Sequence, residues 1–284
     1  MKFCINEITF GEVDFPTAVE ACARGGLGAM ELWLPHVETF LEAGHSPAEA
    51  RERLDDRGLR ATGACFVAGL LAAEGEAKAA AFDAAKRRFE LAQELGADTV
   101  VCVGEGPDEP SDADYAHAAE RLGEVADLAA SFELTVALEF IAASPFLGTL
   151  ASAARLVAQA DHAHLGVLFD VYHFCAGHSK MSGFEGLAGA PIAFVHLADL
   201  PPGPRERLAQ APRLLPGQGA LPLPQLLAHV QAAGYQGYFS VELFNEELWA
   251  QDPTAVARRT REACERLAAA CAQAPQGAAW PPDA

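Results

Sequence analysis

The sequence predicts a single (β/α)8 TIM barrel, and three observations support this prediction. Short β-rich segments alternate with Ala-rich helical segments at intervals of roughly thirty to forty residues, which is the spacing of βα units. The chain holds eight such strand segments, whereas a doubly wound sheet more often stops at about five or six. No Gly-x-Gly-x-x-Gly motif follows the first strand, which argues against a dinucleotide-binding sheet.

The expected strands are short apolar runs rich in β-branched and aromatic residues, as buried parallel strands usually are. Several of them end at a polar residue. In chain order we expect them at Lys2–Thr9, Ala29–Leu34, Arg60–Phe66, Thr99–Val103, Thr135–Phe140, Leu165–Asp170, Ala193–Leu197 and Tyr238–Leu243.

Helical patterns fill the intervals between these strands. Several gaps between a helix and the next strand contain the Gly that commonly ends a helix, at Gly25-Gly26, Gly58, Gly96 and Gly234. We expect helices at Thr17–Arg24, Pro47–Arg57, Lys78–Leu95, Ala113–Ser131, Leu150–Ala160, Leu223–Ala233 and Thr254–Ala270, and a less regular one near Phe184–Ala188.

No linker or change in composition divides the alternating pattern, so residues 1–273 are expected to form one catalytic barrel domain. A Pro- and Gly-rich insertion at Pro201–Gly219 interrupts the pattern before the last helix–strand pair. Residues 274–284 form a C-terminal tail that is expected to fray or to dock on a partner subunit of a homo-oligomer.

The composition excludes several classes of partner. The 39 acidic residues outnumber the 20 basic ones, and the net charge of −19 repels phosphate backbones and anionic membrane surfaces. The seven cysteines are scattered and include no Cys-x-x-Cys pair, which favours free thiols in a reducing compartment. No apolar stretch has the length that a bilayer requires. We therefore expect a cytoplasmic protein that binds neither nucleic acid nor membranes.

Residues able to bind a metal end the fifth to eighth expected strands: Glu139, Asp170, His196 and Glu242. A single Glu at a strand end is most often solvated, and a single His in an apolar strand is more often a hydrogen-bonded core residue. The combination is different, because the C-terminal ends of barrel strands converge and three carboxylates need a cation to share that space. The set suits one divalent ion such as Mn, Co, Mg or Zn.

Five segments in chain order carry a further pattern: Cys4–Glu7, Val136–Phe140, Leu168–Phe174, Leu215–Gly219 and Ser240–Phe244. Together they resemble the xylose isomerase-like TIM barrels, a family of sugar isomerases and epimerases. Within this family the resemblance is greatest to the inosose isomerases, which act on 2-keto-myo-inositol in inositol catabolism. The resemblance extends from the first strand to the last helix.

The resemblance implies one divalent ion held by Glu139, Asp170, His196 and Glu242, with an α-hydroxyketone bound to it through neighbouring oxygens. Isomerisation removes a proton from the hydroxyl-bearing carbon, passes through an enediolate and returns a proton to the former carbonyl carbon. One or both of Glu139 and Glu242 are expected to act as base and acid. The expected substrate is an unphosphorylated keto-polyol such as 2-keto-myo-inositol, because few basic residues lie near the set.

Further residues are candidates for the substrate side of the site. His173 is expected to contact a substrate hydroxyl or shuttle a proton, or else to hold Asp170. Arg213 resembles a family residue that reaches over the substrate from a flexible loop, and its alternative is an ordinary surface Arg. Trp33 either stacks on the substrate or packs the barrel rim. Glu7 and Glu31 could line the mouth of the barrel. Asp199 could support the site or be an ordinary solvated acid at a strand end.

Other functions remain open on the same barrel. One is 3-epimerisation of a ketose, a second is β-elimination from a keto-sugar, and a third is non-catalytic sugar binding. A three-metal apurinic endonuclease of this fold is disfavoured, since the strand ends at Cys65–Val67 and Cys102–Glu105 and the loop Ala211–Arg213 lack its additional His and Asp ligands. Schiff-base chemistry is disfavoured because no expected strand ends in Lys.

Overall fold

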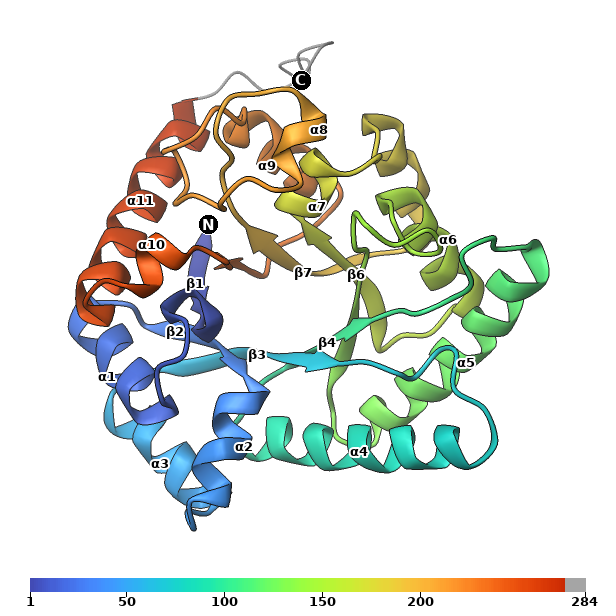
Figure 1. The fold of residues 1–284 in the computed structure, drawn as a ribbon, viewed down its shortest axis with the longest axis horizontal. Coiled ribbons are helices and arrows are strands. Elements are labelled where there is room, and N and C mark those ends of the chain that lie inside the picture. Colours follow the sequence, from blue (N-terminus) through green and yellow to red (C-terminus); the bar gives the residue numbers. More distant parts are fainter. Residues whose placement is uncertain (274–284) are drawn as a thin grey trace.

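The computed structural model describes residues 1–273, and these form a closed barrel of eight parallel strands inside a ring of helices (Figure 1). The first strand pairs with both the second and the eighth, which closes the sheet. The predicted fold is therefore confirmed. The strands are β1 Lys2–Asn6, β2 Ala29–Trp33, β3 Arg60–Val67, β4 Thr99–Val103, β5 Thr135–Glu139, β6 Leu165–Asp170, β7 Ile192–Leu197 and β8 Tyr238–Val241.

Each of the seven helices predicted with a clear pattern is present, with ends shifted by a few residues. They are α1 Phe15–Gly25, α3 Pro47–Asp56, α4 Gly75–Glu94, α5 Asp112–Ala130, α6 Leu150–Ala160, α9 Leu223–Ala232 and α11 Pro253–Gln273. The structure adds shorter helices that the periodicity did not predict, and two of them, α2 and α7, start directly after a strand. These are α2 Leu34–Glu42, α7 Val171–Ala176, α8 Arg205–Leu208 and α10 Glu246–Trp249.

Two predicted elements differ from the structure. The first strand ends at Asn6 rather than Thr9, because the Asn6 side chain accepts a hydrogen bond from the Ile8 N–H and starts the 3-10 helix η1, Glu7–Phe10. The helix expected near Phe184–Ala188 is a 3-10 segment, η2, Met181–Gly189. Its two interior glycines and short length favour the tighter, less regular turn.

The helix ends follow the sequence signals. Gly26 and Gly96 adopt left-handed φ angles of 80° and 78°, which an L side chain rarely takes, and each ends a helix before the next strand. At the other end, Ser46 and Ser111 start α3 and α5 through reciprocal capping boxes. The expected tail at residues 274–284 lies outside the described residues.

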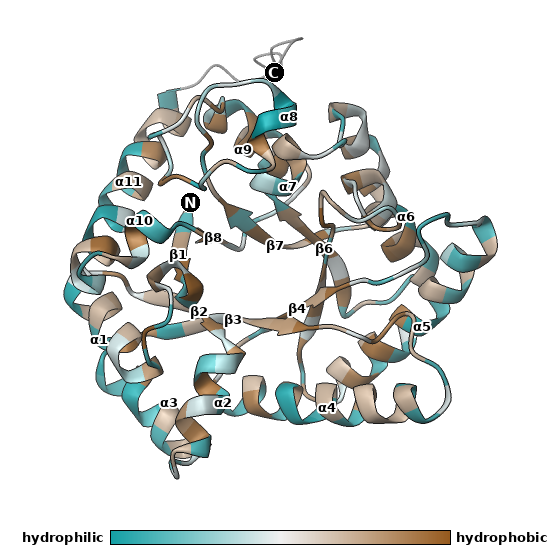
Figure 2. Cartoon of the chain, in the orientation of Figure 1, coloured by the Kyte–Doolittle hydropathy of each residue, from teal (hydrophilic) through white to brown (hydrophobic). Residues whose placement is uncertain are grey.

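The core has two layers. A small cluster fills the interior of the barrel, and a much larger one lies between the strands and the surrounding helices. Figure 2 shows mostly apolar strands enclosed by helices that also carry hydrophilic residues. Successive residues of a strand alternate between these two layers, since side chains of a strand point to opposite faces. Among the described residues, no helix combines the length and the apolar character needed to cross a membrane.

Candidate metal centre

The alternation of the strands places four polar side chains inside the barrel. Two positions before each of them is a residue whose side chain fills or faces the barrel interior. Side chains two positions apart on a strand point to the same face, so all four side chains point into the barrel. Strand pairing then sets them side by side, because Asp170 pairs with His196 and Glu139 with Leu168. The four residues are Glu139 at the end of β5, Asp170 at the end of β6, His196 in β7 and Glu242 directly after β8.

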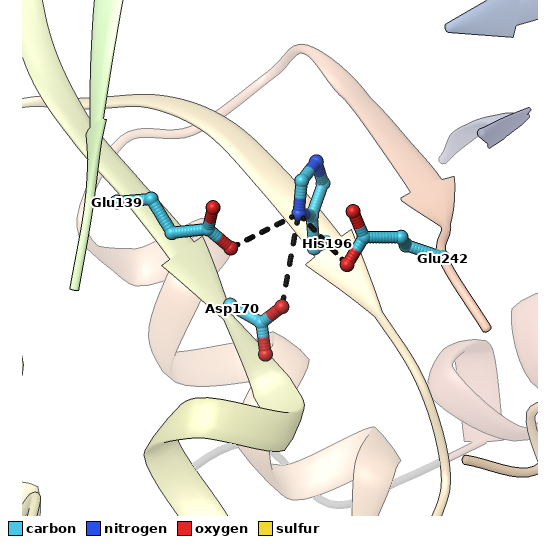
Figure 3. Close-up of side chains that lie close together, drawn as sticks. All are labelled: Glu139, Asp170, His196 and Glu242. Carbon is cyan, nitrogen blue, oxygen red and sulfur yellow. Dashed lines mark ion pairs between the residues drawn. The ribbon is translucent and has the colours of Figure 1, made fainter. Parts of the chain in front are cut away.

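The four side chains converge on one point (Figure 3). One ligand atom from each lies within 4.8 Å of all the others. The His196 Nδ1 atom is 3.3 Å from Glu139 Oε1, 3.4 Å from Glu242 Oε2 and 3.7 Å from Asp170 Oδ2. All four residues are buried. The structure thus brings together all four residues that the sequence singled out as metal ligands.

The hydrogen bonds around His196 show that these groups fit a cation. Its Nε2 atom lies 3.0 Å from a carboxylate oxygen of Glu31 and donates to it, so that when the ring gives up its second proton to bind a cation, Nδ1 presents the lone pair. The His196 Nδ1 and Asp170 Oδ2 atoms are buried without a hydrogen-bond partner among the described residues. Lone pairs that face one another away from water are costly, and a divalent ion would satisfy them.

The charges perturb one another strongly. Burial raises the pKa of Glu139 above its usual value, although His196 lowers it. Burial also raises the pKa values of Asp170 and Glu242, but nearby positive groups, His196 and Arg213 in the case of Glu242, outweigh it and hold both below their usual range. Burial lowers the pKa of His196, yet the surrounding carboxylates raise it well above its ordinary value. The site therefore has a strong preference for positive charge.

Backbone and side-chain contacts hold the carboxylates in place. Asp170 caps α7, because its Oδ1 atom accepts the main-chain N–H of His173 at 2.7 Å. This leaves Oδ2 for the centre of the site. On the other side, the Asn6 amide donates to Glu242 Oε1 at 3.4 Å. Neither the role of Asn6 nor that of Glu31 was evident in the sequence, since both act on residues far away in the chain.

A cavity of about 260 Å³ opens beside this group, and two of the four side chains, Glu139 and Glu242, line it. His173 lines it, and its Nδ1 atom accepts the N–H of Ala142 at 3.2 Å, so that a neutral ring carries its proton on Nε2. The main-chain N–H of His173, not its ring, is what holds Asp170. Trp33 also lines the cavity and packs against Phe66, with ring centroids 5.3 Å apart.

Arg213 is a buried residue of the cavity wall and not an ordinary surface Arg. Its guanidinium lies between the rings of Tyr172 and Phe244, at 4.2 Å and 4.8 Å from their centroids. It donates a short hydrogen bond to Glu242 and lies 3.7 Å from Asp170 Oδ2. The guanidinium thus lies directly beside the candidate metal ligands.

The three remaining acids are all buried, so Asp199 is not the solvated strand-end acid that was one of its two expected roles. Glu31 lies beside His196 inside the barrel. Glu7 accepts the N–H of Trp33 at 3.0 Å and pairs with the ring of His36. Asp199 bonds to backbone N–H groups of the loop after β7. A lone acid in or beside an apolar strand was the available signal for each, but it does not reveal the partner.

Comparisons with known proteins agree with this architecture. The sequence pattern of the family described as xylose isomerase-like TIM barrel matches residues 19–270. A 3-dehydroshikimate dehydratase of Pseudomonas aeruginosa is 32% identical over 81% of the chain, but the chain spans only 36% of that protein. An inosose isomerase of Bacillus velezensis is 32% identical over 51% of the chain and 53% of its own length. The solved structure of the IOLI protein with a bound zinc atom superimposes with a TM-score of 0.85 and 22% identity, covering 95% of this chain and 99% of that one.

Proposed function

The chain belongs to the xylose isomerase-like TIM barrel family, and from this premise we propose that it is a divalent-metal-dependent isomerase of uncharged keto-polyols. One observation carries the proposal: three carboxylates and one imidazole converge beside a small cavity that Glu139 and Glu242 line. The similarity to inosose isomerases makes 2-keto-myo-inositol the first substrate to test. The bound zinc of the related fold supports a divalent ion in the same kind of barrel.

The proposed residues would share the work as follows. Glu139, Asp170, His196 and Glu242 would hold the ion, which would polarise the substrate carbonyl and stabilise the developing oxyanion. Glu139 or Glu242 removes the proton from the hydroxyl-bearing carbon, leaving an enediolate, and one of them returns a proton to the former carbonyl carbon, while the hydroxyl proton passes to the former carbonyl oxygen. The substrate gains and loses no atoms. His173 donates its Nε2–H to a substrate hydroxyl.

The charge of the cavity supports an uncharged substrate. Among the described residues that line it, Arg213 is the one Lys or Arg side chain. Its guanidinium already bonds to Glu242, so it offers little free positive charge to an anionic substrate. The aromatic rings of Trp33, Phe66 and Phe244 supply an apolar wall suited to the C–H face of a polyol ring.

A second candidate is β-elimination of water from a keto-acid such as 3-dehydroshikimate. The similarity to the Pseudomonas dehydratase favours it, because that match covers most of this chain. The same carboxylates could remove the proton next to the carbonyl, but the carboxylate of this substrate would need a cation. Arg213 would then have to leave Glu242 to pair with the substrate.

One experiment separates these reactions. The protein is loaded with Mn²⁺, Co²⁺ or Zn²⁺ and incubated in deuterated water with 2-keto-myo-inositol, a panel of ketohexoses and 3-dehydroshikimate. We expect deuterium incorporation and ketone migration with the keto-polyol, detected by NMR. A 3-epimer or a dehydrated product would identify the alternative reactions instead.

Variants test the role of the site in the same assay. Glu139→Gln combined with Glu242→Gln should abolish exchange while retaining the shape of both side chains. Glu185→Gln, a matched change at an exposed position, should leave it unaltered. Full exchange by the double variant would exclude the proposed chemistry.

A further inference from the structure

Asp199 occupies a closed environment made from backbone. It lies just beyond β7 and is only 1% exposed. Its Oδ1 atom accepts the N–H groups of Leu200 and Leu221, at 2.8 Å and 3.1 Å. Its Oδ2 atom accepts those of Gly217 and Gly219, both at 2.9 Å. Four main-chain donors therefore converge on one carboxylate.

These contacts take the place of a cation. Among the described residues no Lys, Arg or His forms an ion pair with Asp199, and a buried carboxylate is stable only when hydrogen bonds replace its hydration. The approach of the loop is so close that a Cβ on Gly219 would lie 2.3 Å from Asp199 Oδ1 and 2.2 Å from the Leu200 carbonyl oxygen. Glycine is therefore required at this position for the loop to meet the carboxylate.

The same loop carries Arg213. A two-residue antiparallel bridge joins Asp199 to Leu214, with both hydrogen bonds between 2.8 and 2.9 Å. Leu214 follows Arg213 directly, so this bridge ties the main chain next to Arg213 to the main chain of Asp199. The carbonyl oxygen of Arg213 accepts the side-chain amide of Asn245 at 2.8 Å, which fixes the segment from the opposite direction.

We propose that Asp199 is a positioning residue that fixes the loop between residues 213 and 221, so that Arg213 is held over Glu242 in the candidate site. The loop then covers the cavity at all times and is not the flexible lid that its Pro- and Gly-rich sequence indicates. The effect of Asp199 on turnover rests on the proposed function. Its effect on the placement of Arg213 does not.

Chemical labelling tests the placement without any substrate. Asp199→Asn keeps the size of the side chain but turns an NH2 group toward two of the four N–H donors, which breaks those bonds. We expect phenylglyoxal to modify Arg213 roughly tenfold faster in this variant, because the loop opens locally. Arg121, which is 4% exposed and bonds to the Ala73 carbonyl oxygen elsewhere in the barrel, is the internal control.

Peptide mass spectrometry measures the rate at which each of the two arginines is labelled. Faster labelling of Arg213 with unchanged labelling of Arg121 supports the proposal. Equal acceleration at both would show general destabilisation, and no acceleration at Arg213 would show that the loop stays in place without Asp199; either result overturns the proposal. Asp252→Asn, which alters a carboxylate that caps α11 by accepting the Ala255 N–H, should change neither rate.

A kinetic cycle tests the link to substrate. Asp199→Asn should raise the KM for the keto-polyol roughly tenfold with a smaller change in kcat, because a displaced Arg213 would no longer line the substrate cavity in its place over Glu242. In an Arg213→Ala background the same change should have no further effect on KM, because both variants remove one function. An equal rise in KM in both backgrounds would contradict a role through Arg213. Absence of turnover by the wild-type protein would contradict the proposed function and leave the labelling result standing.

Discussion

The Nε2 atom of His196 lies 3.0 Å from Glu31 Oε1, across the interior of the barrel from β7 to β2. The other Glu31 oxygen accepts the hydroxyl of Ser240 at 2.6 Å, and all three side chains are buried. This arrangement fixes both the tautomer and the orientation of the imidazole, so that Nδ1 faces the three carboxylates. A carboxylate that holds a metal-binding His in this way increases the basicity of the ring.

Removing this carboxylate should weaken metal binding. We expect Glu31→Ala to reduce affinity for Zn²⁺ or Co²⁺ roughly 10- to 100-fold, because the ring loses its orientation. Glu31→Gln retains an acceptor oxygen and should lose less. Competition with a chelating dye measures both affinities, and far-UV circular dichroism verifies that the variants are folded. An unchanged affinity in the Ala variant would show that Glu31 does not support the site.

Metal binding should also stabilise the fold. An ion that binds only the native state adds about 2.7 kcal/mol when its concentration is about one hundred times its Kd. We therefore expect Mn²⁺, Co²⁺ or Zn²⁺ to raise the Tm in calorimetry and EDTA to reverse the rise. Asp170→Asn should remove most of the increase, whereas Asp161→Asn, outside the site, should retain it. The absence of any shift with all three ions would contradict the metal centre.

His173 offers a test of substrate contact that separates its two ring nitrogens. Asn at this position can still accept the Ala142 N–H but cannot reach the cavity with a second donor. We expect His173→Asn to lower kcat/KM roughly 10- to 100-fold, the usual cost of one or two lost hydrogen bonds. Its urea midpoint should stay near that of the wild type. His173→Leu loses both contacts and should be less stable as well as less active.

The Glu7–His36 pair predicts a dependence of stability on pH. Burial lowers the pKa of His36, but the hydrogen bond and charge of Glu7 raise it more, to a net value above the usual 6.5. The stabilisation is therefore complete below the unfolded pKa and is lost as the pH rises through the higher folded pKa. Burial also raises the pKa of Glu7, which acts in the same direction at lower pH.

Urea unfolding at pH 6 and pH 9 measures this effect. The wild-type protein should lose more unfolding free energy between these two values than His36→Gln, which cannot titrate. His117→Gln, at a half-exposed His paired with Glu74, serves as the control and should follow the wild type. The same loss in His36→Gln and in the wild type would assign the pH dependence to other groups.

The sequence by itself determined the barrel and the positions of its chemical groups. Alternating strand and helix patterns are local, and so is the two-residue period that points Glu139, Asp170 and His196 inward once their strands are buried. Parallel strands place their C-terminal ends together, so four polar strand ends were sufficient to predict a common site. The short helix α7 was not predictable in this way, because capping by Asp170 rather than apolar periodicity starts it.

Only the tertiary structure decided which groups hold that site. Glu31 and His196 are separated by 165 residues, and Asn6 and Glu242 by 236. Such pairs meet because closure of the barrel sets one register between all eight strands, a long-range property that no local pattern encodes. The partners of Asp199 are likewise decided by the tertiary structure. In the sequence it is an acid at a strand end, where solvation is the ordinary expectation, and only the folded loop surrounds it with N–H groups. Local hydrophobic patterns thus determine the strands and helices of the barrel. Closure of the barrel determines which side chains contact the four site residues.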